Sequence, residues 1–305
     1  MKKLLTFWGE RYLYAPTFFD KFLSFLLLPL TGLYCLVVYY KYKTATPQDF
    51  GIPVVGIGNL VVGGSGKTPL TQALAKNFPG GAVVLRGYGR KSSGLLVVRD
   101  RQKILQDVQQ AGDEAMIYAT SLEKTIVIVS KNRVEGILKA KEMGAGYVLL
   151  DDAYSKHHIK KLELVIKTKT PNSFCLPSGA LREQLWRGKN IHVIEENKEF
   201  VREVVLQNPT EKMVLLTAIA RPQRLDEFLE NENIVSKYYF PDHHFFTQEE
   251  IDAIIQKENP TSLVVTTKDF VKIAHLKTPK ISLLDLHVEL NNMLKTTVRN
   301  YIKQN

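Results

Sequence analysis

From residue 51 onward, short apolar runs rich in β-branched residues alternate with longer segments of helical periodicity. Runs of four to eight such residues are typical of buried strands, whereas helices need ten or more residues. The strands predicted in the first half are 53–57, 82–85, 125–129 and 147–150, with 95–98 at an edge. Helices are predicted at 68–77, at 132–143 and from residue 112. This alternation predicts an α/β fold with a parallel sheet.

The second half repeats the alternation more loosely. Its predicted strands are 191–194, 213–217, 234–239 and 262–266. Its predicted helices are 221–231, 247 to about 257, and a segment after 267. The polar segment 197–212 is the predicted seam between two lobes. We therefore predict three parts: an N-terminal segment at 1–45, an α/β domain at 46–195, and a smaller α/β domain at 196–305 that closes a cleft with the first.

The N-terminal segment has a different pattern. Phe22 to Tyr40 is a run of 19 residues without a charge, bracketed by Lys21 and Lys41, and Pro29 and Gly32 interrupt it. Its length approaches that needed to span a bilayer. Three interpretations are open: a spanning helix, a bent helical hairpin lying in the membrane interface, and a buried helix of the soluble domain. We favour membrane contact, and attachment at the surface over spanning.

The stretch 51–69 combines a predicted strand, a glycine-rich loop and the start of a helix. The loop glycines are Gly58, Gly63, Gly64 and Gly66, and Lys67-Thr68-Pro69 follow them. In such a loop the backbone N–H groups and the helix dipole hold phosphates, the lysine reaches the outer phosphates, and the threonine can bind Mg²⁺. The common pattern has a glycine where this chain has Val61. We predict a phosphate site and a P-loop NTPase-like first domain.

Composition adds a preference for anionic partners. The chain has 305 residues, a net charge of +10 and 45% apolar residues, so it can form a substantial core and favours a nucleotide, a phospholipid headgroup or a nucleic acid. It has no helix-turn-helix or aromatic RNA-binding signature, so we predict no nucleic-acid partner. Its two cysteines, Cys35 and Cys175, lack metal-type spacing and predict neither a zinc site nor a disulfide framework.

Acidic residues supply the candidate metal site. Asp151 and Asp152 follow the predicted strand 147–150, and the carboxyl ends of parallel strands lie beside the phosphate loop. Asp113 and Glu114 open a helix, where acids are usually caps. His243 lies in an aromatic-rich segment and, on its residues alone, does not identify a site. The segments 86–90 and 176–183 are glycine-flanked loops with arginines, which suit either phosphate contact or a solvated turn.

Together these segments resemble the tetraacyldisaccharide 4′-kinase family, the lipid A 4′-kinases of Gram-negative bacteria. The resemblance covers nearly the whole chain in order. It rests on Leu28-Pro29-Leu30, Gly58-Asn59-Leu60, Gly63-Gly64-Ser65-Gly66-Lys67-Thr68-Pro69, Arg86-Gly87-Tyr88-Gly89-Arg90, Gly112-Asp113-Glu114, Asp151-Asp152, Leu176-Pro177, Gly179, Arg182-Glu183, Asp242-His243, Thr266 and Lys268-Asp269.

The resemblance implies transfer of the ATP γ-phosphate to the 4′-hydroxyl of a tetraacylated glucosamine disaccharide 1-phosphate, at the cytoplasmic face of the inner membrane. It implies that Gly63, Gly64, Ser65, Gly66, Lys67 and Thr68 hold ATP. Thr68, Asp151 and Asp152 would hold Mg²⁺, and Arg182 and Glu183 would line the ATP and metal site. Asp113 would be the catalytic base, supported by His243, with Lys67 also taking part in catalysis. The lipid substrate and the membrane surface are the expected partners.

The chain departs from the family pattern at two places. After the paired acids it has Ala153-Tyr154-Ser155-Lys156 in place of Gly-Phe-Gln-His, and Thr267 replaces a glutamate. The alternative interpretation is a membrane-associated P-loop ATPase or GTPase with a protein partner. Thr267-Lys268-Asp269-Phe270 does not supply the Asn-Lys-x-Asp motif with which a GTPase reads guanine.

Overall fold

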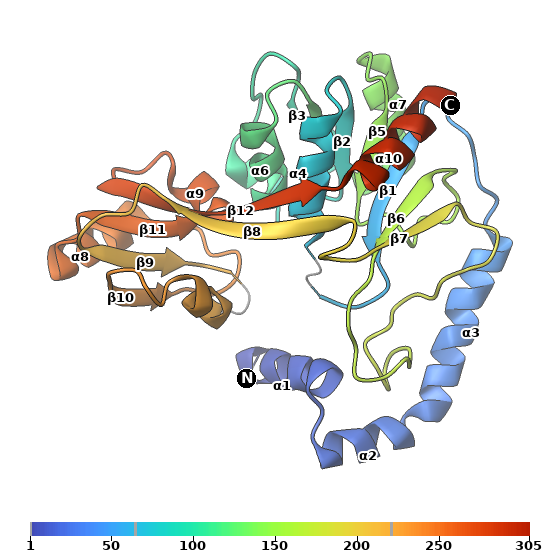
Figure 1. Cartoon of the computed structure of the whole chain (residues 1–305), viewed down its shortest axis with the longest axis horizontal. Helices are drawn as coiled ribbons and strands as arrows, with labels where there is room; N and C mark the ends of the chain where they lie inside the picture. The colour runs from blue at the N-terminus through green and yellow to red at the C-terminus, as the bar shows by residue number, and fades with distance from the viewer. Residues whose placement is uncertain (1, 64–65, 220–221) are drawn as a thin grey trace.

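The computed structural model describes residues 2–63, 66–219 and 222–305, and it has two lobes, each built on one sheet (Figure 1). Gly64 and Ser65 of the predicted phosphate loop, and Arg221 at the start of a predicted helix, lie outside the described residues. Both sheets are largely parallel and are covered by helices, so the predicted α/β fold is confirmed.

The first lobe contains a seven-stranded sheet of order β3-β4-β2-β5-β1-β6-β7, in which only β3 is antiparallel to its neighbour. Its strands are β1 (Val54–Asn59), β2 (Ala82–Leu85), β3 (Leu96–Arg99), β4 (Ile126–Val129), β5 (Val148–Asp151), β6 (Leu162–Ile166) and β7 (Ile191–Ile194). Its helices are α4 (Lys67–Asn77), α5 (Val108–Ala111), α6 (Asp113–Ser121) and α7 (Arg133–Glu142). Apolar residues of α4 and α6 pack on one face of the sheet and those of α7 on the other. Burial on both faces explains the continuous apolar runs of the strands.

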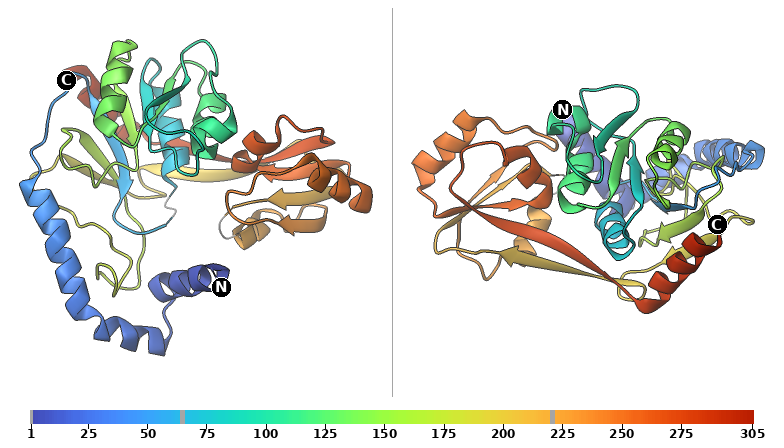
Figure 2. Two further views of the ribbon diagram at one scale, coloured as in Figure 1. Left: turned by 180° about the vertical axis from the view of Figure 1, so that it is seen from behind. Right: turned by 90° about the horizontal axis from the view of Figure 1, so that it is seen from above.

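The second lobe contains a five-stranded sheet of order β10-β9-β11-β12-β8, with only β8 antiparallel. Its strands are β8 (Phe200–Gln207), β9 (Met213–Thr217), β10 (Ile234–Tyr239), β11 (Ser262–Thr266) and β12 (Lys280–Leu290). Its helices are α8 (Gln248–Glu258) and α9 (Thr267–Ile273). Figure 2 shows the long strands β8 and β12 reaching from this sheet toward the first lobe.

The last helix, α10 (Asn292–Gln304), returns to the first lobe. Its Leu294 and Val298 are fully buried in the core that α4 and α6 share. The predicted domain 196–305 therefore ends in a helix whose packing belongs to the first lobe. The links between the lobes are thus β8 and β12, which pair over eight positions.

The predicted seam 197–212 contains β8, one of the two links between the lobes, whose half-exposed residues gain their hydrogen-bond partners from β12, about eighty positions later in the chain. One local prediction is wrong. The segment predicted as the helix 221–231 forms a short 3₁₀ helix at Pro222–Phe228, in which no residue is fully buried and Leu225 packs only partly against the core. The strands β6 and β12 and the helix α10 were not predicted.

The N-terminal residues form three helices, α1 (Lys2–Tyr14), α2 (Phe18–Leu26) and α3 (Leu28–Thr44), which make a bent arm beside the first lobe (Figures 1 and 2). The axes of α2 and α3 differ by 61°. Pro29 lies in the first turn of α3, where a proline starts a new helix without losing a hydrogen bond. Within the described residues, no one helix has the length and apolar character to cross a bilayer, although the bent pair passes that test jointly.

Candidate active site

A cavity of about 630 Å³ lies where β1 ends and α4 begins. All six residues of β1 are buried, and Gly66, with φ of +77°, turns the chain into the helix. That left-handed conformation suits glycine, which has no Cβ. The cavity is lined by residues of the phosphate loop and of the facing strand ends: Val62, Gly63, Gly66, Lys67, Thr68, Pro69, Leu85, Arg86, Tyr88, Glu114, Arg133, Asp151, Asp152 and Arg182.

Two cations hold Asp152 at the edge of this cavity. The Arg182 guanidinium forms an ion pair with Asp152 and donates to Oδ1 of Asn59 at 2.8 Å. The Lys67 ammonium lies 3.6 Å from Asp152 and 3.4 Å from Asn59. Burial opposes ionisation of Asp152, but Lys67 and Arg182 outweigh it and lower the pKa of this carboxyl. The site therefore contains an ionised acid and two cations close to the phosphate loop.

Asp151 has a different environment from its neighbour. It is buried at the end of β5, and its Oδ2 accepts a hydrogen bond of 2.8 Å from the Tyr118 hydroxyl. Its other oxygen, Oδ1, is buried without a hydrogen-bond partner in the described part of the chain. Burial raises the pKa of this carboxyl. Asp151 lines the phosphate cavity, and a buried carboxylate oxygen without a hydrogen-bond partner there is suited to bind a Mg²⁺ ion directly.

Within the described ranges, no group of three or more His, Cys, Asp and Glu side chains is arranged to hold a metal. Mg²⁺ keeps several waters and takes one or two carboxylates plus nucleotide phosphates. Thr68 lines the same cavity as Asp151. The two residues fit such a site, with the remaining positions left to water and phosphate.

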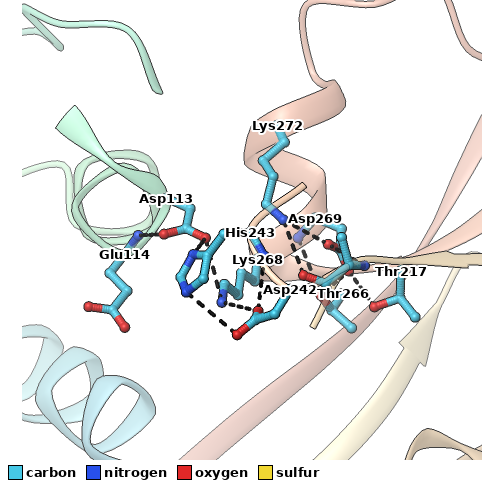
Figure 3. Close-up of polar contacts among 10 residues, drawn as sticks. Asp113, Glu114, Thr217, Asp242, His243, Thr266, Lys268, Asp269 and Lys272 are labelled. Atoms are coloured by element: carbon cyan, nitrogen blue, oxygen red, sulfur yellow. Dashed lines mark hydrogen bonds and ion pairs between the residues drawn. The ribbon is translucent and has the colours of Figure 1, made fainter. Parts of the chain in front are cut away.

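A second cluster joins the two lobes (Figure 3). Asp113, the buried first residue of α6, has its Oδ2 2.8 Å from Nδ1 of His243 and 3.5 Å from the Lys268 ammonium. Lys268 also lies 3.0 Å from Asp242, whose other oxygen is 3.6 Å from Nε2 of His243. Asp113 belongs to the first lobe, and the other three residues belong to the second. The cluster therefore places a carboxylate and an imidazole at the junction between the lobes.

The charges of this cluster set its protonation states. Burial works against the charged form of Asp113, but His243 and Lys268, with a smaller effect of Lys272, lower its pKa. The hydrogen bond to Asp113 raises the pKa of His243 above its ordinary 6.5. Asp113 is consequently ionised at neutral pH. The adjacent Glu114 lines the phosphate cavity, and burial together with repulsion by Asp151 and Asp113 raises its pKa to about 7.

The chain matches one family over almost its entire length. A family model described as tetraacyldisaccharide-1-P 4′-kinase matches residues 23–203 and 193–303. The chain is 43% identical over 314 residues to the tetraacyldisaccharide 4′-kinase of Aliarcobacter butzleri (strain RM4018), with 99% of each chain covered. It is 42% identical over 301 residues to that of Campylobacter jejuni subsp. jejuni serotype O:2, covering 97% of this chain and 96% of the relative.

This chain belongs to the tetraacyldisaccharide 4′-kinase family. The resemblance inferred from its motifs is confirmed, and the protein is a phosphotransferase. Its fold is similar to that of LpxK from Aquifex aeolicus, solved in complex with ATP, with a TM-score of 0.71 at 22% identity, covering 92% of this chain and 99% of that chain.

The side chains of Arg182 and Glu183, which the sequence predicts at the ATP site of this kinase, lie in different surroundings. Arg182 lines the cavity, whereas the buried carboxylate of the next residue, Glu183, accepts from Nε1 of Trp186 at 3.1 Å and lies 3.4 Å from Nε2 of His157. Residues 182 and 183 form a bend, and of the two only Arg182 lines the cavity, so a role of Glu183 at the ATP site stays a prediction.

Sequence reasoning assigned no role to four residues of this kinase site. Glu114 and Arg133 line the cavity, Asn59 accepts hydrogen bonds from both cations, and Lys268 bridges two acids. Asn59, Glu114 and Lys268 belong to the motifs that carry the family resemblance, so those motifs could have identified them as site residues. Arg133 donates to the carbonyl oxygens of Ser130 and Asp151 from the start of α7 and had no such signal.

We expect the variant Lys268→Met to raise the pH at which His243 titrates. Lys268 opposes the positive charge of the imidazolium, so its removal favours the protonated form. An NMR pH titration of the His243 ring measures the change, with His243→Asn used to assign the signal. Lys268→Arg keeps the charge and should titrate near the wild type. An unchanged titration in Lys268→Met would show that Lys268 does not act on this pair.

Proposed function

We propose that this protein transfers the γ-phosphate of ATP to the 4′-hydroxyl of a tetraacylated glucosamine disaccharide 1-phosphate, giving the bisphosphorylated precursor of lipid A. One observation carries the proposal beyond family membership. The phosphate cavity and the Asp113–His243 pair lie side by side, since Asp113 adjoins the cavity-lining Glu114. A nucleotide phosphate and an acceptor hydroxyl can therefore meet between the lobes.

The residues of the cavity divide the binding of MgATP between them. The backbone around Gly63 and Gly66 and the Lys67 ammonium would hold the phosphates, and Arg182 would add a second cation. Thr68 and Asp151 would hold Mg²⁺ directly, and Asp152 through water. When bound, Mg²⁺ neutralises the charge that develops on the β- and γ-phosphates. Phosphoryl transfer depends mainly on such positioning and neutralisation.

Asp113 would act as the general base. It takes the proton of the 4′-hydroxyl while the sugar oxygen forms a bond to the γ-phosphorus, and the bond from that phosphorus to the β,γ-bridging oxygen of ATP breaks. Because the pKa of Asp113 is lowered, the carboxylate is available at neutral pH. His243 holds one of its oxygens and orients the other.

We propose that α2 and α3 attach the protein to the cytoplasmic face of the inner membrane. Their polar and apolar sides are arranged in the opposite way to those of a surface helix in water. Polar side chains such as Asp20, Ser24 and Thr31 are buried against the protein. Large apolar side chains face outward, with Phe18 and Phe19 80% and 81% exposed. The others on this face are Phe22, Phe25, Leu26, Leu30, Leu33 and Leu36. An exposed apolar face of this size favours a lipid surface, where the acyl chains of the substrate reside.

The alternative, a P-loop ATPase or GTPase with a protein partner, is not favoured by membership of this kinase family. The test is phosphate transfer from γ-labelled ATP to a tetraacylated disaccharide 1-phosphate in detergent micelles. We expect a labelled bisphosphorylated lipid that is absent without the acceptor. ATP hydrolysis without any lipid product would instead support the alternative.

The proposed metal site makes a separate prediction. Asp151→Asn should raise the Mg²⁺ concentration for half-maximal activity roughly tenfold or more, because a neutral amide is a weaker ligand than a carboxylate. A Mg²⁺ titration of the initial rate measures this, with Asp100→Asn, a half-buried residue outside the cavity, as the control. An unchanged titration would remove Asp151 from the metal site.

A further inference from the structure

A buried hydroxyl cluster connects the apolar helices to the loop that carries Arg182. The hydroxyl of Thr31 on α3 donates to the hydroxyl of Ser178 at 2.7 Å and accepts from the Ser178 backbone N–H at 3.1 Å. The Ser178 hydroxyl in turn donates to the carbonyl oxygen of Ser24 on α2 at 2.7 Å, and the Ser24 hydroxyl donates to the carbonyl oxygen of Ser178. All three residues are buried. Their hydrogen bonds fix the segment around Ser178 to both helices.

The same segment is attached to the phosphate loop. The backbone N–H of Val62 donates to Ala180 at 3.0 Å, and that of Arg182 donates to Leu60 at 2.7 Å. Gly179, which lies between Ser178 and Ala180, is tightly packed, since a Cβ there would lie 2.4 Å from the carbonyl oxygen of Phe174. A closely packed loop transmits a displacement instead of absorbing it. The position of Ser178 therefore determines where Arg182 leaves the loop.

A second contact reaches Arg182 itself. The hydroxyl of Tyr34, one turn after Thr31 on α3, donates to the carbonyl oxygen of Arg182 at 3.1 Å. The side chain of Arg182 then reaches Asn59 and Asp152 in the cavity. Hydrogen bonds thus join the inner face of α3 to the segment that carries Arg182, a cation beside the phosphate loop.

We propose that Thr31 and Ser178 are positioning residues for Arg182, through which the apolar helices α2 and α3 hold the ATP site in its working geometry. The inference rests on the proposed function, since it gives Arg182 a role in holding the nucleotide. It assigns the helices a part in the reaction in addition to attachment at the membrane.

The test compares Thr31→Val, which keeps the side-chain shape and removes the hydroxyl, with two matched variants. Thr31→Ser restores the hydroxyl, and Thr44→Val removes one from the exposed end of the same helix, where it donates to the carbonyl oxygen of Tyr40. Each is also made in an Arg182→Ala background. The Kd for MgATP, the kcat for lipid phosphorylation and the flotation of the full chain with anionic phospholipid vesicles are measured.

We expect Thr31→Val to weaken ATP binding and lower kcat about tenfold, since small displacements of a positioning group have effects of this order. Thr31→Ser and Thr44→Val should stay near wild type, and flotation should not change. In the Arg182→Ala background, Thr31→Val should have no further effect, because the two residues act as a unit.

An equal tenfold loss in both backgrounds would overturn the proposal, as would wild-type behaviour of Thr31→Val. A loss that parallels reduced flotation would likewise overturn it, because the helices would then act only as an anchor. If Thr31→Val does not fold, Tyr34→Phe removes a single hydroxyl bonded to the same segment and is tested in the same two backgrounds. The ATP measurement requires no lipid, so failure of the wild-type protein to phosphorylate the lipid would contradict the proposed function and leave this test intact.

Discussion

The variant Asp113→Asn is expected to lower kcat for lipid phosphorylation about 10³-fold, within the range that general bases contribute. An asparagine has nearly the same shape as aspartate and can still accept a hydrogen bond from His243. It cannot take the proton of the acceptor hydroxyl. Because Asp113 faces the second lobe while other residues line the cavity, the Kd for ATP should change by no more than about threefold.

Initial rates over a range of lipid concentrations give kcat, and calorimetry gives the affinity for ATP. Asp107→Asn is the matched control, because Asp107 caps the short helix α5 just before Asp113, outside the cavity, and asparagine caps equally well. A comparable loss of kcat and ATP affinity would identify Asp113 as a binding or structural residue. An active Asp113→Asn enzyme would show that another group is the base. Glu114 is the candidate, because it lines the cavity and its pKa is raised.

The variant Lys67→Ala is expected to reduce kcat/KM for ATP by about 10²- to 10³-fold, the effect of removing one fixed electrostatic contact to a transition state. The Lys67 ammonium is largely buried beside Asp152 and Asn59, so it is already directed into the cavity before the nucleotide binds. Its loss also leaves Arg182 as the remaining cation on Asp152.

Labelled phosphate transfer at several ATP concentrations measures this effect. Lys76→Ala serves as the control, since Lys76 is an exposed lysine in the last turn of the same helix. Both variants should melt near the wild-type temperature, which shows that the loss is not one of folding. Retention of full kcat/KM in Lys67→Ala would mean that the loop does not hold the phosphates as proposed.

Local features of the sequence were sufficient to predict the phosphate cavity. A buried strand, a glycine-rich loop and a lysine at a helix start adjoin one another in the chain, and β1 and α4 form within a few residues of the predicted limits. Asp151 and Asp152 were predicted beside them because parallel strands end at one edge of a sheet. The loop, Lys67 and the two acids come together through near neighbours or neighbouring strands, whereas Arg182 reaches Asn59 from 123 positions away.

The remaining features depend on contacts between distant parts of the chain. His243 lies 130 positions from Asp113, and no periodicity indicates that the two meet. The strand β8 was not predicted because its partner is β12, and the path of the loop decides that Arg182 lines the cavity while Glu183 contacts Trp186 and His157.

The sequence by itself determined the α/β class, the phosphate loop and the family. Only the tertiary structure decided that Lys268 joins His243 beside Asp113, and that the polar side of α2 and α3 holds the Arg182 loop. The physical reason is that strand runs, helix starts and glycine turns follow from interactions within a few residues. The pairing of charges and hydroxyls across 130 or more positions is fixed by the packing of the complete chain.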